Sequence, residues 1–529
     1  MLLRKIISII IAIIMIIPLG FVVGSAFGVD AAVWQKLLAR RIPQLMLNST
    51  LLVTFVCLAS VILGGGLAFL VERTTLPFKN FFRTLLIAPL ITPCYIIGIC
   101  YINFVGKNGL AEKWLSGIGL DITVPSFYGF WGASFILVLG IFPYVFTLVS
   151  SAMHTFDPRF SDSAKCLGLN AWQRLIHVSI PMLIPALSAS VILVGLYVLS
   201  DFGVVSMLRY PTFVSVIYEQ IASRYDFQSA AALSTVLVMF TLVFFLGQEV
   251  LTYRKEFSSL KIKVFNQKKY VLGAWLAPTI ILISLIVIFS LVVPITVLIY
   301  WFIKSTHLAS ETQVWVTPFK EILRSGLNSL SISALVATVA VVLALPIAYL
   351  RVRTPNSKFT RVLTWMAQSG LALPGVLVAL GVSLVITKTI PSLTYSIFAL
   401  FFAFLIHFFA QTYQTMFAGL TQISKQFEES GRMLGCSSFQ TFWHITRPLL
   451  LPSIMTSWIL IFLSAMRELP ASLLLRPAGF DPLTVKVWIA ASEGFYELAA
   501  LPALCVIILS LPMVILVSKG SGRSTYELS

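Results

Sequence analysis

Twelve apolar runs constrain this chain more than any other feature of its sequence. Each run approaches or exceeds roughly 20 residues, the length an α-helix needs to cross the hydrocarbon core of a bilayer. The runs lie near residues 6–28, 49–71, 84–104, 128–151, 182–206, 229–249, 272–302, 328–350, 362–386, 393–418, 449–466 and 497–518. The sequence therefore predicts an all-α integral membrane protein with about twelve transmembrane helices.

The composition excludes a soluble protein of this length. Hydrophobic residues make up 58% of the 529 residues and charged residues only 11%, whereas a soluble domain carries roughly 25% charged residues. The net charge of +17 comes from short basic clusters between the apolar runs, which is typical of membrane proteins and not of a nucleic-acid-binding face.

The basic residues also indicate an orientation. If the N-terminus is cytosolic, the cytosolic segments hold 23 of the 37 Lys and Arg residues, and this bias favours both termini inside. The run after Met1 could be a secretory signal, but it is longer than the 7–15 apolar residues of a signal core. We interpret it as a retained first membrane helix.

Two polar segments between the runs are copies of each other. We call Asp157–Pro185 the first island and Ser424–Pro452 the second island. The two islands align without a gap at an offset of 267 positions. The aligned pairs are Asp162 with Glu429, Gly168 with Gly435, His177 with His444, Pro181 with Pro448 and Pro185 with Pro452. A passive connector would drift in length, so the constant spacing favours a docking surface over an amphipathic connector resting on headgroups.

Each island is predicted to form a helix, a turn and a second short helix. Asp157 and Ser424 are expected N-caps, while Gly168 and Gly435 are expected to turn the chain in the left-handed region. The other signals are the second N-caps Asn170 and Ser437 and the prolines Pro181 and Pro448, which are expected to end the second short helix.

The rest of the chain repeats as well. Leu47-Asn48-Ser49 matches Leu327-Asn328-Ser329 at an offset of 280, and Arg73-Thr74 matches Arg353-Thr354. The sequence therefore predicts two parallel six-helix repeats, 1–255 and 256–529, related by an axis along the membrane normal.

The island pattern, an acid and two small residues followed by glycine and then proline thirteen positions later, resembles the EAA loop of ABC importer permeases. In that family the loop forms coupling helices that sit in clefts of two ATPase subunits. The resemblance implies ATPase contact by Asp162, Ala164, Gly168, Trp172, His177, Pro181, Glu429, Gly431, Gly435, Phe439, His444 and Pro448. The chain has no Gly-x-x-x-x-Gly-Lys-Ser/Thr loop, so it is expected not to be an enzyme and to depend on ATP hydrolysis by partners.

A further matched pair of acids follows each island. Asp201 aligns with Glu468 and Arg209 with Arg476, and Asp201 lies about 24 Å along a helix from Pro185. These residues and Arg467 could line a substrate path, where paired acids would suit a cation and paired arginines an anion. Equally, they could be ordinary helix-end residues that pair with one another.

The segments Arg467–Pro477 and Ser200–Gly203 resemble the fused two-half permeases of ferric iron importers, a likeness that extends over essentially the whole chain. It implies a type I ABC importer permease in a bacterial inner membrane, fed by a periplasmic substrate-binding protein. Thiamine, phosphonate and polyamine permeases are close to that group, and these segments do not separate them.

A proton-coupled secondary transporter is the rival class, because it too can have six-plus-six repeats, but it would have no use for the islands. The six cysteines show no metal-ligand spacing, so we expect no cofactor and no metal site. Pro93 and Pro374 fall inside apolar runs and are expected to kink helices.

Overall fold

The computed structural model describes residues 2–106, 109–117, 119, 126–154, 158–253, 270–312, 316–355 and 357–523. Within these ranges the chain is helical, and the β-structure there is one isolated bridge between Thr74 and Tyr270. The described residues contain nine helices long and apolar enough to cross a membrane, or ten if one bent pair is counted. The nine are Lys5–Ala26, Ala31–Arg73, Phe130–Met153, Ile176–Ser200, Gly273–Thr306, Lys320–Arg353, Ile397–Gln422, Ser438–Met466 and Tyr496–Met513.

All twelve predicted apolar runs coincide with helices. The bent pair Lys79–Ile91 and Cys94–Lys113 covers the third run, and the shorter apolar helices Phe227–Val243 and Gly375–Thr389 fall in the sixth and ninth runs. The all-α fold with about twelve membrane helices is therefore confirmed, although not every run forms one straight span.

The prediction that Pro93 and Pro374 kink continuous helices was wrong, because the helix ends completely at both residues. Pro93 has φ −57° and ψ 140°, and Pro374 has φ −54° and ψ 148°. This extended ψ removes both residues from the helix, and a new helix starts at the next residue, Cys94 or Gly375. The third and ninth runs are thus each two helices joined by a short 3-10 turn.

The chain forms two compact units, and each combines segments from distant parts of the sequence. One unit comprises Leu38–Val216 and Met239–Ser305. Its helices are α3 (Ile42–Arg73), α4 (Lys79–Ile87), η2 (Ala88–Ile91), α5 (Cys94–Val105), α6 (Leu110–Gly117), α7 (Phe130–His154), α8 (Pro158–Cys166), α9 (Ala171–Arg174), η3 (Leu175–Ser179), α10 (Ile180–Ser200), α11 (Gly203–Met207), η4 (Gly273–Trp275), α14 (Leu276–Val287), η5 (Ile288–Val292) and most of α15 (Val293–Thr312).

The other unit comprises Met1–Leu37, Ile217–Val238 and Thr306–Ser529. Its helices are α1 (Leu2–Ala26), α2 (Ala31–Lys36), α16 (Val316–Arg353), α17 (Lys358–Ala367), η6 (Ser369–Ala372), α18 (Gly375–Thr389), η7 (Pro391–Leu393), α19 (Ile397–Gln422), α20 (Lys425–Met433), α21 (Ser438–Thr441), η8 (Phe442–Thr446), α22 (Arg447–Met466), α23 (Pro470–Leu475), α24 (Leu483–Ser492) and α25 (Tyr496–Arg523). The boundaries between the units fall within η1 (Leu37–Arg41), α12 (Phe213–Ala222) and α13 (Phe227–Tyr253), and toward the end of α15.

The two units have matching cores of three helices. In the first, α3, α7 and α10 pack on one another, and in the second α16, α19 and α22 do so. Close approach has a visible cause at Gly64 on α3, where a Cβ would lie 2.7 Å from the carbonyl oxygen of Phe142 on α7. The small residue lets the helices meet at backbone distance, as membrane helices commonly do.

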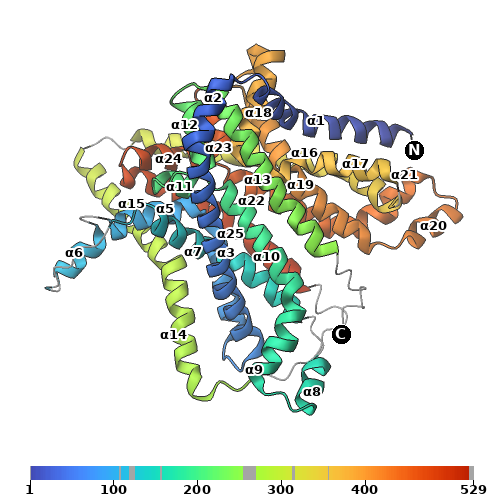
Figure 1. Ribbon diagram of the computed structural model, residues 1–529, viewed down its shortest axis with the longest axis horizontal. Helices are drawn as coiled ribbons and strands as arrows, with labels where there is room; N and C mark the ends of the chain where they lie inside the picture. The colour runs from blue at the N-terminus through green and yellow to red at the C-terminus, as the bar shows by residue number, and fades with distance from the viewer. Residues whose placement is uncertain are drawn as a thin grey trace. The chain divides into compact units, whose positions relative to one another are not determined.

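The first helix of each predicted half packs with the core of the other half. Helix α1 lies in the unit that contains α16, α19 and α22, and α14 lies in the unit that contains α3, α7 and α10. Helix α1 lies against α17 and α18 (Figure 1), and the Ser369 hydroxyl donates to the carbonyl of Met15 at 3.4 Å. In the other unit, the Tyr101 hydroxyl of α5 donates to the carbonyl of Phe289 in η5 at 2.6 Å. The compact units therefore cross residue 255, and the division into two permease halves at that residue stays a prediction.

Candidate functional site

The two islands fold into the same helix–turn–helix shape. The first short helix is α8 in one island and α20 in the other, and each has nine residues. Each is followed by a glycine in the left-handed region, Gly168 at φ +83° and Gly435 at φ +87°. The amide of the next residue then donates to the carbonyl four residues before the glycine at 3.1 Å, from Leu169 to Ala164 and from Cys436 to Gly431. The predicted glycine turns are confirmed in both copies.

Asn170 and Ser437 cap the second short helix of each island, as predicted, and in each case the cap is one half of a reciprocal capping box. The Asn170 side chain accepts from the Gln173 amide at 2.8 Å, and the Gln173 side chain accepts from the Asn170 amide at 3.0 Å. Ser437 and Gln440 exchange the same two bonds at 3.3 and 2.8 Å. These boxes satisfy amides that a helix start leaves without partners.

The prediction that Pro181 and Pro448 end this second helix was wrong. The chain passes through a π-helical turn, η3 or η8, directly into the membrane helix α10 or α22. Each proline is the second residue of its membrane helix, and because proline has no amide hydrogen, the helical hydrogen bond of that residue is missing there. Each island, which we also call a platform, is therefore continuous with a membrane helix.

The recurring histidines lie in these π turns. The Nδ1 atoms of His177 and His444 are each 3.0 Å from the carbonyl oxygen four residues earlier, in Gln173 and Gln440 respectively. Both side chains are exposed, so they are available to a partner on the surface of the platform.

The small residue of the motif allows the two short helices of an island to touch. Ala164 and Gly431 occupy matched positions and are both buried. A Cβ at Gly431 would lie 2.5 Å from Cδ1 of Ile445 in η8. The motif therefore restricts size at this position because the second helix packs directly over it.

Each platform exposes large apolar side chains next to its glycine turn. Leu167 is 81% exposed and the matched Leu434 is 86% exposed. In the second island Phe439 is 70% exposed, and its ring stacks on Trp443 at 6.0 Å between centroids. Ser424 caps α20 through the Gln426 amide at 3.3 Å. Exposed apolar side chains that gather in this way are typical of surfaces that contact a protein partner or a membrane.

Some predicted coupling residues lie outside this description. Asp157 and the side chains of Asp162 and Trp172 are beyond the described part of the structure. Glu429, the partner of Asp162 in the alignment, is exposed and pairs with Lys425 at 2.8 Å one helical turn earlier.

A buried carboxylate beside Glu429 was missed by sequence reasoning. Glu428 is only 3% exposed. One of its oxygens accepts from Nη2 of Arg353 at 2.6 Å and from the hydroxyl of Thr446 at 3.2 Å, and the other accepts from the hydroxyl of Tyr349 at 2.8 Å. Burial alone would raise the pKa of Glu428, but the hydrogen bonds from Arg353 and Tyr349 outweigh it and lower the pKa below its ordinary value.

The first half has a different buried carboxylate. Glu72, near the end of α3, accepts two bonds of 2.6 Å from Arg83 of α4 and one of 2.5 Å from Ser150 of α7. It ties α3 to two membrane helices, whereas Glu428 ties α16 to the second island. A signal was present in the sequence, because acids are rare in this chain and Glu428 stands next to a matched acid.

The matched acids Asp201 and Glu468 occupy matched structural positions. Each follows its core helix, α10 or α22, and precedes a short helix, α11 or α23. Asp201 accepts from the Val204 amide at 2.9 Å, and Glu468 accepts from the Ala471 amide at 3.5 Å. Both carboxylates therefore face the start of the following short helix, and Glu468 also lies 3.7 Å from Nε2 of His407.

The three arginines lie in separate settings. Arg209 has φ +54° and its guanidinium lies 5.1 Å from the ring centroid of Tyr128. Arg476 forms an ion pair with Asp481, which Lys486 also approaches at 3.6 Å. Arg467 is the residue directly after α22. The two acids contact helix amides and, in the case of Glu468, His407.

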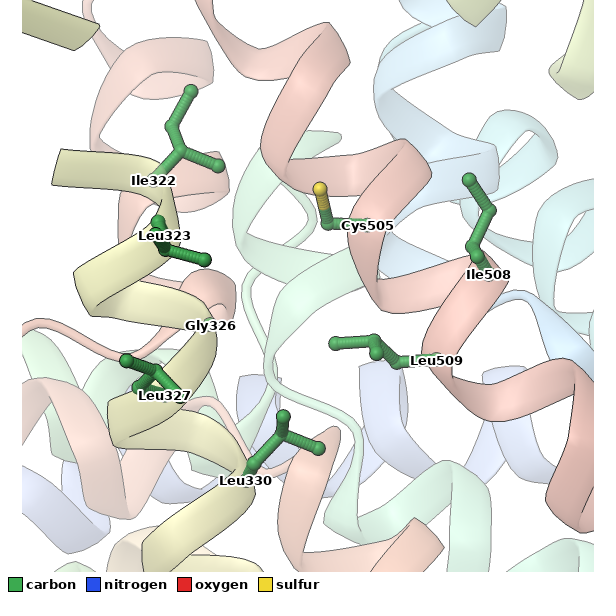
Figure 2. Close-up of a pocket in the computed structure, with 8 residues that line it drawn as sticks. All are labelled: Ile322, Leu323, Gly326, Leu327, Leu330, Cys505, Ile508 and Leu509. Atoms are coloured by element: carbon green, nitrogen blue, oxygen red, sulfur yellow. The ribbon is translucent and has the colours of Figure 1, made fainter. Parts of the chain in front are cut away.

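The part of the chain that the structure describes holds no cluster of metal-binding side chains. Among those residues, no three His, Cys, Asp or Glu side chains gather closely enough to hold a metal ion. A groove of about 280 Å³ between α16 and α25 is lined by apolar residues such as Leu323, Leu330 and Ile508 (Figure 2). Its lining suits hydrocarbon and not a charged cargo.

Comparison with known proteins defines the class. Two stretches, residues 64–256 and 338–518, match the family model described as the inner membrane component of binding-protein-dependent transport systems. Each matched stretch contains one island. The chain therefore belongs to this family of ABC transport permeases, with the type I permease domain present twice.

Individual relatives narrow the comparison. The chain is 29% identical over 514 residues to the Fe(3+)-transport system permease protein FbpB 2 of Haemophilus influenzae. This alignment covers 95% of each of the two chains. It is 24% identical over 468 residues to the ferric transport system permease protein FbpB of Actinobacillus pleuropneumoniae, covering 85% of this chain and 67% of that one. The sulfate transport system permease protein CysT of Escherichia coli matches 44% of this chain at 23% identity.

The family membership settles several predictions. The chain is a multi-pass inner membrane transport protein and not an enzyme, and it works with ATPase and substrate-binding partners. The relative that matches nearly the full length shows that a fused two-half permease is an existing arrangement in this family.

Proposed function

We propose that this chain is the permease of a ferric iron importer in a bacterial inner membrane, with both termini in the cytosol. The observation that carries the cargo assignment is the likeness to ferric transport permeases along 95% of the chain. The sulfate and molybdenum permeases match less than half of it. The same machinery for thiamine, a phosphonate or a polyamine is the alternative.

We propose further that the two islands dock two ATPase subunits. The support is the shared fold of the platforms, their matched glycine turns, and the exposed Leu167 and Leu434. ATP binding would draw the ATPase subunits together and carry the islands with them. Because each island continues without a break into α10 or α22, that movement would reach the membrane helices directly.

We infer that Asp201 and Glu468 hold the short helices α11 and α23 in place. Each carboxylate accepts from the start of such a helix, which is the work of an N-terminal cap. On this proposal a hydrated or chelated cargo is selected by the substrate-binding partner. The arginines Arg209, Arg467 and Arg476 then shape the outer ends of the units and do not bind cargo.

The test is reconstitution of the tagged full-length chain with the partners that co-purify from native membranes. We expect a partner with a phosphate-binding loop, two copies of it per chain, and ATP-dependent accumulation of radioactive Fe(III) in proteoliposomes when the binding protein is added. Accumulation of thiamine, a phosphonate or a polyamine instead would contradict the iron assignment. Uptake driven by a proton gradient without ATP would contradict the importer mechanism and support a secondary transporter.

A further inference from the structure

The carboxylate of Glu428 joins three helices at one buried point. Glu428 belongs to α20, Thr446 to η8, and Arg353 and Tyr349 to the end of α16. Both α20 and η8 belong to the second island, whereas α16 is a core membrane helix that packs on α19 and α22. The ion pair is therefore a direct link between the island and the helical core of its unit.

The burial of this link distinguishes it from the other charges on the platform. The side chains of Arg353 and Glu428 are 13% and 4% exposed, whereas those of Lys425 and Glu429 on the same helix are 65% and 52% exposed. An exposed pair exchanges readily with water and transmits little force. A buried pair is costly to break, because removing one partner leaves the other charge buried and uncompensated, so the pair holds the parts in a fixed arrangement.

The residues of this link are only partly repeated in the first half of the sequence. Arg353 itself is matched by Arg73, and the hydroxyls of Thr354 and Thr74 accordingly donate to the carbonyls of Leu350 and Leu70, both at 2.5 Å. The position that matches Glu428 is occupied by Ser161, and the one that matches Tyr349 by Phe69. Neither of these can supply the carboxylate or the phenol, so the matched positions of the first half do not repeat the set Glu428, Arg353 and Tyr349.

We propose that Glu428, Arg353 and Tyr349 are positioning residues that couple the second island rigidly to its membrane core. This deepens the proposed function, because it rests on the islands being the ATPase docking sites. Movement of the second island then reaches α16 through a buried ion pair, in addition to the direct path from the island into α22.

The first part of the test needs neither ATPase nor cargo. Hydrogen exchange is measured on the purified full-length protein in lipid nanodiscs for the wild type, Glu428→Gln and Tyr349→Phe, which removes one hydroxyl and keeps the ring. Lys425→Gln, which breaks the exposed pair on the same helix, is the control. We expect faster exchange in residues 425–446 of Glu428→Gln and Tyr349→Phe. Exchange in residues 158–179 of these variants, and throughout the Lys425→Gln control, should match the wild type. Unchanged exchange, or equal loosening of both islands, would overturn the proposal.

The second part measures coupling in complexes with the co-purified ATPase. For Glu428→Gln and Arg353→Gln, we expect the number of cargo ions moved per ATP to fall about tenfold, within the usual range of an allosteric coupling, while the amount of bound ATPase stays at the wild-type level. The double variant should be no worse than either single one, because the two residues act as one unit. A wild-type ratio in the variants, or loss of ATPase binding, would contradict the coupling role.

These measurements separate the two proposals. If the wild-type complex shows no ATP-dependent Fe(III) uptake, the proposed function fails, and the hydrogen exchange still decides whether the link fixes the second island. If the wild type transports and the variants keep the normal ratio, only the link is refuted.

Discussion

Gly375 at the start of α18 lies directly against the carboxylate of Glu468, so closely that any Cβ at residue 375 would collide with Oε1. In the first half, α5 likewise meets the short helix α11, but there the glycine lies on the short helix, because a Cβ at Gly203 would lie 2.5 Å from Cβ of Tyr95. The two halves thus place one glycine at the same contact, but on different helices.

This contact predicts that Gly375→Ala destabilises the protein. The added methyl would displace Glu468 from the Ala471 amide, and loss of a cap costs about 1 kcal/mol. We expect a thermal unfolding midpoint lower by a few degrees for purified protein in detergent. Gly326→Ala is the matched control, because Gly326 is helical and open space surrounds its missing Cβ. That variant should be neutral or slightly more stable, and an equal loss in both would argue against the contact.

Substitutions of Asp201 distinguish a cap from a cargo ligand. Asp201→Asn keeps an oxygen that can accept from the Val204 amide but removes the charge, whereas Asp201→Ala removes both. If the carboxylate is a cap, the Asn variant should transport normally and the Ala variant should lose about 1 kcal/mol of stability. Fe(III) uptake and thermal midpoints measured together decide the matter, since a cation ligand would fail in both variants.

The glycine turn of each island offers a test of docking. Gly168→Asp and Gly435→Asp should abolish transport while abundance in the membrane stays normal, because the turn lies beside the exposed Leu167 and Leu434. Asn has about the same size as Asp and adopts the left-handed backbone conformation as readily as Asp does, but it carries no charge. Gly435→Asn should therefore retain much more uptake than Gly435→Asp. Normal uptake in both aspartate variants, with the protein present, would refute docking at the islands.

The stability contributed by Glu428 should depend on pH. Because hydrogen bonds lower its folded-state pKa below the ordinary 4.5, the carboxylate stabilises the fold fully above pH 4.5 and loses this effect as the pH falls through the folded-state value. The difference in thermal midpoint between the wild type and Glu428→Gln should therefore be constant from about pH 6 to 7 and narrow below pH 4.5. A difference that grows on acidification would show that the pKa is raised instead.

Local signals were read correctly from the sequence because each depends on a few neighbouring residues. The glycine turns at Gly168 and Gly435 and the capping boxes at Asn170 and Ser437 follow from rules that operate within one turn of helix. Apolar length predicted the membrane helices for the same reason. The complete breaks at Pro93 and Pro374 were missed because membrane helices often continue through proline, and the outcome depends on neighbouring helices.

The longer-range relationships could not be predicted in this way. Comparing two repeats reveals only what the halves share, so it found Glu429 and passed over Glu428, because the first half has Ser161 at the matched position. Hydrophobic length likewise says that a helix is embedded but not which helix it packs against. The docking of α1 on α17 and α18 could be found only in three dimensions.

That docking has a consequence for how the protein is made. Ser369 bonds to the carbonyl of Met15, and a Cβ at Gly381 would lie 2.7 Å from the carbonyl oxygen of Pro18, so α1 fits against helices that are synthesised more than three hundred residues later. At about 5–20 residues per second, the ribosome needs tens of seconds to supply them. During that interval α1 lies in the bilayer without its packing partners. The insertion machinery or the surrounding lipid therefore has to cover the face of α1 that α17 and α18 contact once they are synthesised.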